Sequence, residues 1–190
     1  MSAVVKGGFF RRIVERVFAR PESSTPRWSA NKILNIVCGT TIAWMLLWLG
    51  VSHYWRLGVE MQSQGCLPWR YFVLTTHAPT TIERNQTYQY QSEGAPLMPN
   101  GMRIVKYVAG LPGDHVVVNA SGISINGKFW GPVSAETLRK GHMTIAQVTK
   151  DYIVPPGKLV VLGTTSVTWD SRYWGPINRM QVNARAYHLW

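Results

Sequence analysis

Two residues of this chain could together attack a carbonyl group, a cysteine at position 66 and a lysine at position 106. Cys66 lies in the segment Gly65-Cys66-Leu67-Pro68, and the only other cysteine, Cys38, falls within a long apolar run. A thiol loses its proton more easily than a hydroxyl does, and the resulting thiolate is a strong nucleophile. A lone cysteine is more often a small buried apolar residue, so a role in chemistry depends on a nearby base.

Lys106 is the candidate base. It lies between Arg103 and Asp114 in the stretch RIVKYVAGLPGD, where the flanking valines and a tyrosine predict a strand. Burial among such side chains favours the neutral amine, which is the form that accepts a proton. The alternative is a lysine on an edge strand, with its ammonium group in water.

A third stretch, Leu162 to Pro176, is dense in hydroxyl side chains and contains Asp170 and Arg172 two residues apart. On an extended chain both side chains would leave the same face, a spacing that suits an ion pair fixing a loop. Ser171 between them is a conceivable nucleophile, but we expect its hydroxyl to bond the backbone instead.

These residues require a β-rich scaffold to bring them together. Runs of β-branched and aromatic residues, separated by Gly, Pro, Asn or Ser, predict strands joined by turns. The runs are Arg70 to Thr75, Thr87 to Gln91, Arg103 to Val108, His115 to Asn119, Ile123 to Ile125 and Lys158 to Leu162. Only residues 134–148 have a helical pattern, with Ser134 as the cap. We therefore predict a mainly β domain over residues 56–190.

An apolar segment precedes this domain. Residues 33–51 form an uncharged run of nineteen residues, long enough to cross a hydrocarbon core of ~30 Å. Aromatic residues border the run, as is typical of membrane interfaces. A buried core helix is one alternative; a cleavable signal peptide is another, but no A-x-A-like site closes the run. We predict a transmembrane anchor over residues 33–55.

The basic segment 1–32 sets the expected orientation. Seven Lys or Arg residues precede the apolar run, so the N-terminus should be cytoplasmic and the β domain exported. Apolar residues at helical spacing between Phe10 and Phe18 indicate an amphipathic helix on anionic lipid, with a solvated basic tail as the alternative. The net charge of +11 is spread thinly over the rest of the chain, so we expect no nucleic-acid partner.

The motifs KYVAGLPGD and WDSRYWGPI, in this order after an anchor, resemble those of the bacterial type I signal peptidase (S26) superfamily. Residues 154–163 look like the strand that leads into the second motif. The short domain and the form of the motifs are most similar to the TraF-type branch, whose members mature conjugative pilins and in some systems cyclise them. The resemblance implies a folded β-sheet or barrel domain in the periplasm, anchored in the bacterial inner membrane.

The resemblance also implies roles for individual residues. The nucleophile, directly before the Leu-Pro pair, falls on Cys66, and the base falls on Lys106. The hydroxyl that orients the lysine falls on Thr168, and Asp170 with Arg172 matches the structural ion pair. Ser63 is out of register with the Leu-Pro pair.

Oxyanion donors in this superfamily are the backbone N–H of the nucleophile and a side chain two residues earlier, here Gln64. The chain departs from the superfamily in three places. Cysteine replaces serine, Gln64 replaces a small hydroxyl residue, and Asn85-Gln86 stands where an Arg-Gly-Asp-like turn is usual.

The expected function is a membrane-bound endopeptidase or transpeptidase that matures, or cyclises, a pilin precursor. A thioester at Cys66 would favour attack by amines over water, which suits cyclisation. The alternative is an inactive relative that serves as an assembly subunit of the transfer apparatus; general signal-peptide removal fits the small domain less well. Expected partners are the pilin precursor peptide, inner-membrane lipid and other transfer-apparatus proteins. No cofactor is expected and, since the five histidines show no paired metal spacing, no metal either.

Overall fold

The computed structural model describes residues 29–61, 65–165 and 167–189. The chain divides into two compact units, Met1–Leu46 and Leu47–Trp190, and each is described by itself. The expected amphipathic helix of the basic segment, Ser63 and Gln64 all lie outside the described residues.

The apolar run forms one long helix, α2 (Ala30–Tyr54), of 25 residues. At 1.5 Å per residue this is about 37 Å of helix, and its most apolar stretch has a mean hydropathy of 1.8. None of its residues is buried in the structure. The hydroxyls of Thr40 and Thr41 donate to backbone carbonyls one turn earlier, which satisfies them without water. The helix is thus long and apolar enough to cross a bilayer.

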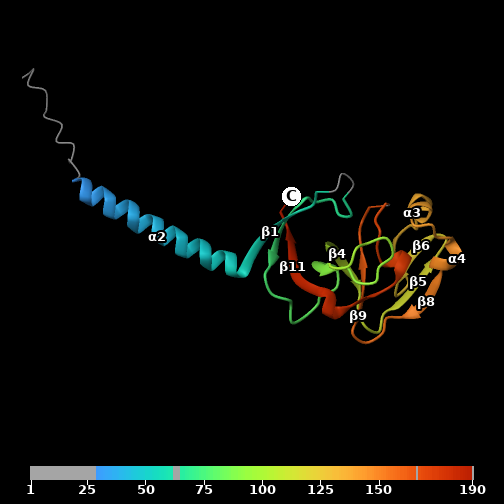
Figure 1. The fold of residues 1–190 in the computed structure, drawn as a ribbon. Coiled ribbons are helices and arrows are strands. Elements are labelled where there is room, and N and C mark those ends of the chain that lie inside the picture. Colours follow the sequence, from blue (N-terminus) through green and yellow to red (C-terminus); the bar gives the residue numbers. More distant parts are fainter. Residues whose placement is uncertain (1–28, 62–64, 166, 190) are drawn as a thin grey trace, which may run out of the picture. The chain divides into compact units, whose positions relative to one another are not determined.

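The chain after the helix folds into two antiparallel sheets (Figure 1). The larger sheet contains seven strands, in the spatial order β1 (Trp55–Val59), β2 (Tyr71–Thr75), β11 (Val182–His188), β3 (Gln86–Gln91), β4 (Arg103–Gly110), β9 (Lys158–Leu162) and β10 (Ile177–Asn178). The smaller sheet contains β7 (Lys128–Gly131), β6 (Gly122–Ile125), β5 (His115–Asn119) and β8 (Lys150–Ile153). Within this unit, the small sheet and β1 lie at opposite ends (Figure 1). The prediction of a mainly β domain is confirmed.

Strand β4 shows how the large sheet places its residues. Val108 packs into a buried cluster with Tyr88, Tyr90 and Val161, and Lys106 lies on the same face because side chains alternate along a strand. The neighbouring residues Val105 and Tyr107 pack against a second cluster, around Leu67, Phe72, Leu74, Ala184 and Ala186. The apolar strand thus carries its single lysine into the interior.

The helical segment differs from its prediction. Instead of one helix over residues 134–148, the chain forms α3 (Ala135–Lys140) and α4 (Ile145–Val148). Ser134 caps α3 as expected, its hydroxyl accepting a bond from the Thr137 amide at 3.3 Å. Gly141 ends α3, because glycine is a poor helix former, so the pattern is broken in its middle.

Candidate active site

Lys106 is buried, with 1% of its surface exposed, and it lies on β4 directly opposite Tyr88 of β3. Its amine donates a short hydrogen bond to the hydroxyl of Thr168, which is also buried. Within the described part of the chain, Lys106 forms no ion pair. The amine therefore has a hydroxyl as its partner and no fixed counter-charge.

Cys66 lies in the connection between β1 and β2, and three contacts hold that connection. The backbone carbonyl of Cys66 accepts a bond from the Thr164 amide at 3.0 Å. The hydroxyl of Thr165 donates to the Gly65 carbonyl at 3.1 Å. Leu67 is buried in the cluster with Phe72. Cys66 itself is half-buried and has a free thiol, while its backbone is held by these contacts.

Gly163, at the end of β9, joins the two parts of the site. A side chain at this position would meet the Cys66 carbonyl oxygen at 2.6 Å and would overlap the Thr168 side chain. Atoms do not approach so closely without displacement, and here one of them is backbone. Position 163 therefore requires glycine so that Cys66 and Thr168 can both lie against it.

A buried ion pair fixes Gly163 in turn. Asp170 and Arg172 are joined at 2.9 Å, with side chains 0% and 2% exposed. Asp170 accepts the Gly163 N–H at 2.8 Å, and Arg172 donates to the Gly163 carbonyl at 2.8 Å. The indole of Trp130 donates to the same carbonyl at 3.1 Å. The pair thus acts on the site through the backbone of one glycine.

The backbone at this pair differs from the expected extended chain. Asp170 caps a single helical turn, α5 (Ser171–Trp174), and accepts the Arg172 amide at 3.1 Å. The side chains meet because the turn folds Arg172 back over the capping carboxylate. As expected, the hydroxyl of Ser171 bonds the backbone: it accepts the Val161 amide at 3.0 Å, which makes Ser171 unavailable as a nucleophile.

The first motif ends in a second ion pair, between Asp114 and Arg84, with 2.7 Å between Nη2 and Oδ1. Burial opposes ionisation of Asp114, but hydrogen bonds from Arg84, the Leu111 amide and Asn126 lower its pKa to about 2. Asn85 follows Arg84 with a φ of 60°, a left-handed conformation that asparagine tolerates. Asn85 therefore adopts a backbone conformation that glycine would also adopt.

The predicted site residues are only partly in direct contact. Lys106 and Thr168 bond each other, and Thr168 and the Cys66 backbone lie against Gly163. No hydrogen bond joins the Cys66 thiol to Lys106 within residues 65–165 and 167–189. Catalytic hydrogen bonds often form only with substrate bound. The predicted donor Gln64 is outside the described residues.

Sequence reasoning missed a tyrosine beside the site. Tyr90 of β3 is 1% exposed, and its hydroxyl has no hydrogen-bond partner among the residues that the structure describes. Burial chiefly, and then electrostatic interaction with Asp170 and Cys66, raise its pKa well above the ordinary value. The sequence offers one indication: Tyr88 and Tyr90 alternate along a predicted strand and so share a face.

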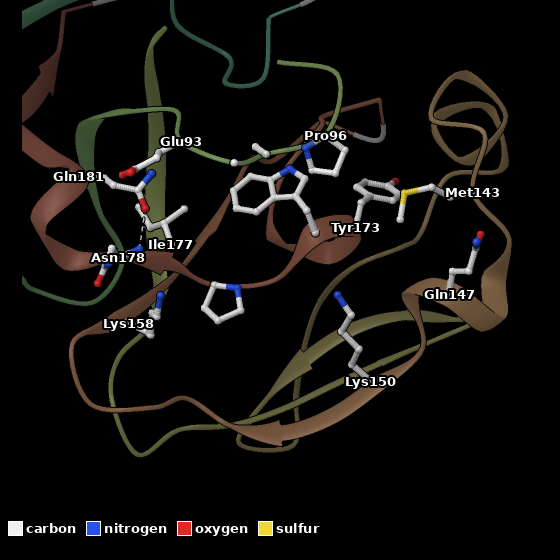
Figure 2. A pocket seen from close by; sticks show the side chains of 14 residues that line it. Glu93, Pro96, Met143, Gln147, Lys150, Lys158, Tyr173, Ile177, Asn178 and Gln181 are labelled. Carbon is white, nitrogen blue, oxygen red and sulfur yellow. Dashed lines mark hydrogen bonds between the residues drawn. The ribbon is translucent and has the colours of Figure 1, made fainter. Parts of the chain in front are cut away.

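A separate cavity of about 480 Å³ lies beside α5 and β10 (Figure 2). Lys150 and Lys158 project toward it, together with Glu93, Gln181 and Met143 (Figure 2). Burial lowers the pKa of Lys150. The lining includes none of Cys66, Lys106 and Thr168, so the candidate chemistry lies elsewhere. The described residues also contain no cluster of three or more His, Cys, Asp or Glu side chains able to hold a metal.

Comparison with known proteins gives a family match. The family model described as signal peptidase, peptidase S26, matches residues 36–190. No curated protein matches the chain by sequence. Among solved structures, the chain is similar to a signal peptidase I from Enterococcus faecalis V583, with 26% identity and a TM-score of 0.34. The match covers 54% of this chain and 94% of the other.

Proposed function

The chain belongs to the signal peptidase family, peptidase S26, and from this membership we propose that it is a membrane-bound peptidase with Cys66 as nucleophile and Lys106 as general base. Its substrate is a conjugative pilin precursor, which it cleaves and cyclises. The observation that carries the proposal is the buried contact between Lys106 and Thr168. A scaffold has no need of a buried amine held by a hydroxyl, since burying an amine costs free energy that only a function would offset.

The roles follow from the chemistry of each group. Lys106 accepts the thiol proton, and the Cys66 sulfur attacks the scissile carbonyl carbon. The Cys66 backbone N–H, with Gln64 as a side-chain donor, stabilises the oxyanion. When the intermediate collapses, the leaving amine takes the proton back from Lys106, and a thioester remains at Cys66. Thr168 keeps the amine directed toward the sulfur.

The second half of the reaction decides the product. A thioester reacts with amines in preference to water more than an ester does, so replacement of serine by cysteine favours aminolysis. We therefore propose that the amino group of the same pilin chain attacks the thioester carbonyl carbon. The new peptide bond closes the ring, the bond from carbon to sulfur breaks, and Cys66 leaves as the thiol after taking the proton of the amine. Attack by water would give a linear chain heavier by one water.

Anchoring supports this role. Helix α2 meets the length and hydropathy of a membrane span, and we propose that it crosses the bacterial inner membrane with a cytoplasmic N-terminus and a periplasmic β domain. A pilin precursor held in the same bilayer meets the site at a high effective concentration. Inner-membrane lipid and other transfer-apparatus proteins are the remaining proposed partners.

Pilin maturation in cells tests the proposal. A conjugative pilin precursor is co-expressed with the wild type, Cys66→Ala, Cys66→Ser or Lys106→Ala, and the products are weighed by mass spectrometry. We expect Cys66→Ala and Lys106→Ala to abolish processing, a loss of at least about a hundredfold. Lys128→Ala is the matched control, because Lys128 is an exposed strand lysine.

Two results would contradict the proposal. Unchanged processing in all three site variants would make the chain an assembly subunit of the apparatus. A wild-type product that is heavier than the ring by one water would support the proposed peptidase activity but contradict the proposed cyclisation.

A further inference from the structure

Tyr90 has a hydroxyl that the fold does not use. The side chain is 1% exposed, and within residues 29–61, 65–165 and 167–189 its oxygen has no hydrogen-bond partner. A buried hydroxyl without a partner disfavours the folded state. Phenylalanine would fill nearly the same volume without that cost. The stability of the fold therefore does not explain why this residue has a hydroxyl group.

Two other tyrosines, the buried Tyr88 and the partly buried Tyr152, make this clearer. Tyr88 lies two residues earlier on the same face of β3 and is equally buried, but its oxygen accepts the Glu83 amide at 2.9 Å. Tyr152 of β8 also has an unpaired buried hydroxyl. Tyr88 is thus a matched residue with a satisfied hydroxyl, and Tyr152 is one with an unsatisfied hydroxyl in the other sheet.

The register of the large sheet brings Tyr90 next to the site. Tyr88 pairs with Lys106 and Tyr90 pairs with Ile104, so Tyr90 and Lys106 are diagonal neighbours on one face, within reach of a long side chain. Lys106 bonds Thr168, and Thr168 and the Cys66 backbone both lie against Gly163. The tyrosine therefore belongs to the same buried group of contacts.

Electrostatics agrees with this placement. Burial chiefly, and then electrostatic interaction with Asp170 and Cys66, raise the pKa of Tyr90, whereas burial alone raises the pKa of Tyr152 to about 12. The phenol keeps its proton and can donate a hydrogen bond. The carboxylate of Asp170 already accepts bonds from Arg172 and the Gly163 amide. A Cys66 sulfur that has given up its proton in the proposed reaction is the other acceptor, and it can only accept.

We propose that the Tyr90 hydroxyl donates a hydrogen bond to the Cys66 sulfur once the thiol proton has moved to Lys106. The proton passes from Sγ to Nζ, Tyr90 keeps its own proton, and no covalent bond changes. The other charged groups of this buried cluster are Lys106 from β4 and the Asp170–Arg172 pair at α5, which bonds Gly163. The inference rests on the proposed function, because it requires Cys66 to be the nucleophile.

The test measures the reactivity of Cys66 in the full-length protein in detergent. Every variant carries Cys38→Ala, so that Cys66 is the only thiol in the chain. The rate of alkylation by iodoacetamide is followed from pH 6 to pH 9 for the wild type, Tyr90→Phe, Tyr88→Phe and Tyr152→Phe. Thermal unfolding of each variant is recorded alongside.

We expect Tyr90→Phe to react about tenfold more slowly near neutral pH, the size expected for a lost hydrogen bond to a charged group. The difference should vanish at high pH, where the thiol is ionised in both proteins. Tyr152→Phe removes an equally unpaired hydroxyl and should match the wild type within about twofold. Tyr88→Phe should lower the unfolding temperature without slowing alkylation.

Three results would overturn the inference. The first is an alkylation rate of Tyr90→Phe equal to that of the wild type. The second is a rate lowered by the same factor at every pH, which would indicate that the reagent reaches the sulfur less easily. The third is an equal loss of rate in Tyr88→Phe or Tyr152→Phe. The variant Lys106→Met distinguishes a failure of this inference from a failure of the proposed function. If Lys106→Met leaves both alkylation and pilin processing unchanged, the proposed function fails; if only Tyr90→Phe has no effect, the role of the hydroxyl alone fails.

Discussion

The two acidic residues of the sequence motifs, Asp114 and Asp170, are both paired with arginine, but in contrasting surroundings. Asp170 and Arg172 are two residues apart, and both side chains are almost completely buried. Asp114 and Arg84 are thirty residues apart, and the Arg84 side chain is 37% exposed. The first pair is sealed from water, whereas the second is open to it on the arginine side.

The remaining bonds of each arginine show what each pair supports. Arg172 also donates to the carbonyls of Gly163 and Pro132, so it holds the backbone against which Cys66 and Thr168 lie. Arg84 also donates to the Ala109 carbonyl at 2.9 Å, near the turn between β4 and β5. The same pairing chemistry therefore supports the candidate site in one place and the fold of a turn in the other.

The largest effect is expected from Arg172→Ala. Removal of one partner leaves the Asp170 carboxylate buried and unpaired, and such a change costs about 3–5 kcal/mol of unfolding free energy. Because Gly163 also loses a donor, alkylation of Cys66 should change as well. Unfolding by guanidinium, followed by tryptophan fluorescence, measures the loss. Arg84→Ala is the control and should cost less, since water can replace Arg84 at the surface; equal losses would remove the distinction between the pairs.

Asp114→Asn should have an intermediate effect that depends on pH. The pKa of Asp114 is lowered to about 2 in the folded chain, against ~4 when unfolded. A lowered pKa stabilises the fold above the unfolded value, and this contribution disappears as the pH falls from about 4 to about 2. We expect the variant to lose about 2 kcal/mol at pH 7 and almost nothing at pH 2.

Unfolding midpoints of the wild type and Asp114→Asn between pH 2 and pH 7 measure this difference. The rate of Cys66 alkylation at pH 7 should be the same in both proteins. A constant difference across the pH range would show that the lost stability does not come from the charge of Asp114.

The smallest effect is expected from Gly113→Ala in the same turn. Gly113 has a φ of 90°, and an added Cβ would meet open space, so the cost is backbone strain alone, about 1 kcal/mol. Thermal unfolding should detect it, with alkylation of Cys66 unchanged. Gly131→Ala is the control, because its φ is ordinary and its nearest contact would be 3.5 Å. No loss in Gly113→Ala would mean that the turn relaxes freely.

The strands that could be predicted from the sequence are those in which apolar side chains recur regularly along the strand. Residues 115–119 and 158–162 match β5 and β9 without change. Strand β1 was missed because Trp55, Leu57 and Val59 continue the apolar run and look like the membrane border. Strand β11 was missed because its buried positions include Ala184 and Ala186, and alanine has little strand preference.

Residues of the site could be predicted where a motif specifies the residue type. They could not be predicted where the role of a residue depends on its tertiary contacts. Lys106 and Thr168 were both proposed from the motifs, and they contact each other. Gly163 and Trp130 gave no local indication, because their roles depend on tertiary contacts, and the alternation of Tyr90 with Tyr88 indicated only a shared face. The extended chain expected at Asp170 was wrong, since alternate spacing does not distinguish a strand from one turn of helix capped by its own carboxylate.

The position of β11 between β2 and β3 makes the order of synthesis matter. Chains grow from the N-terminus, so Cys66 and Lys106 leave the ribosome long before residues 182–188. Until those residues arrive, β2 and β3 each lack a neighbour, and the large sheet is split in two. A chain that ends before Val182 therefore lacks the strand that joins the two halves of this sheet.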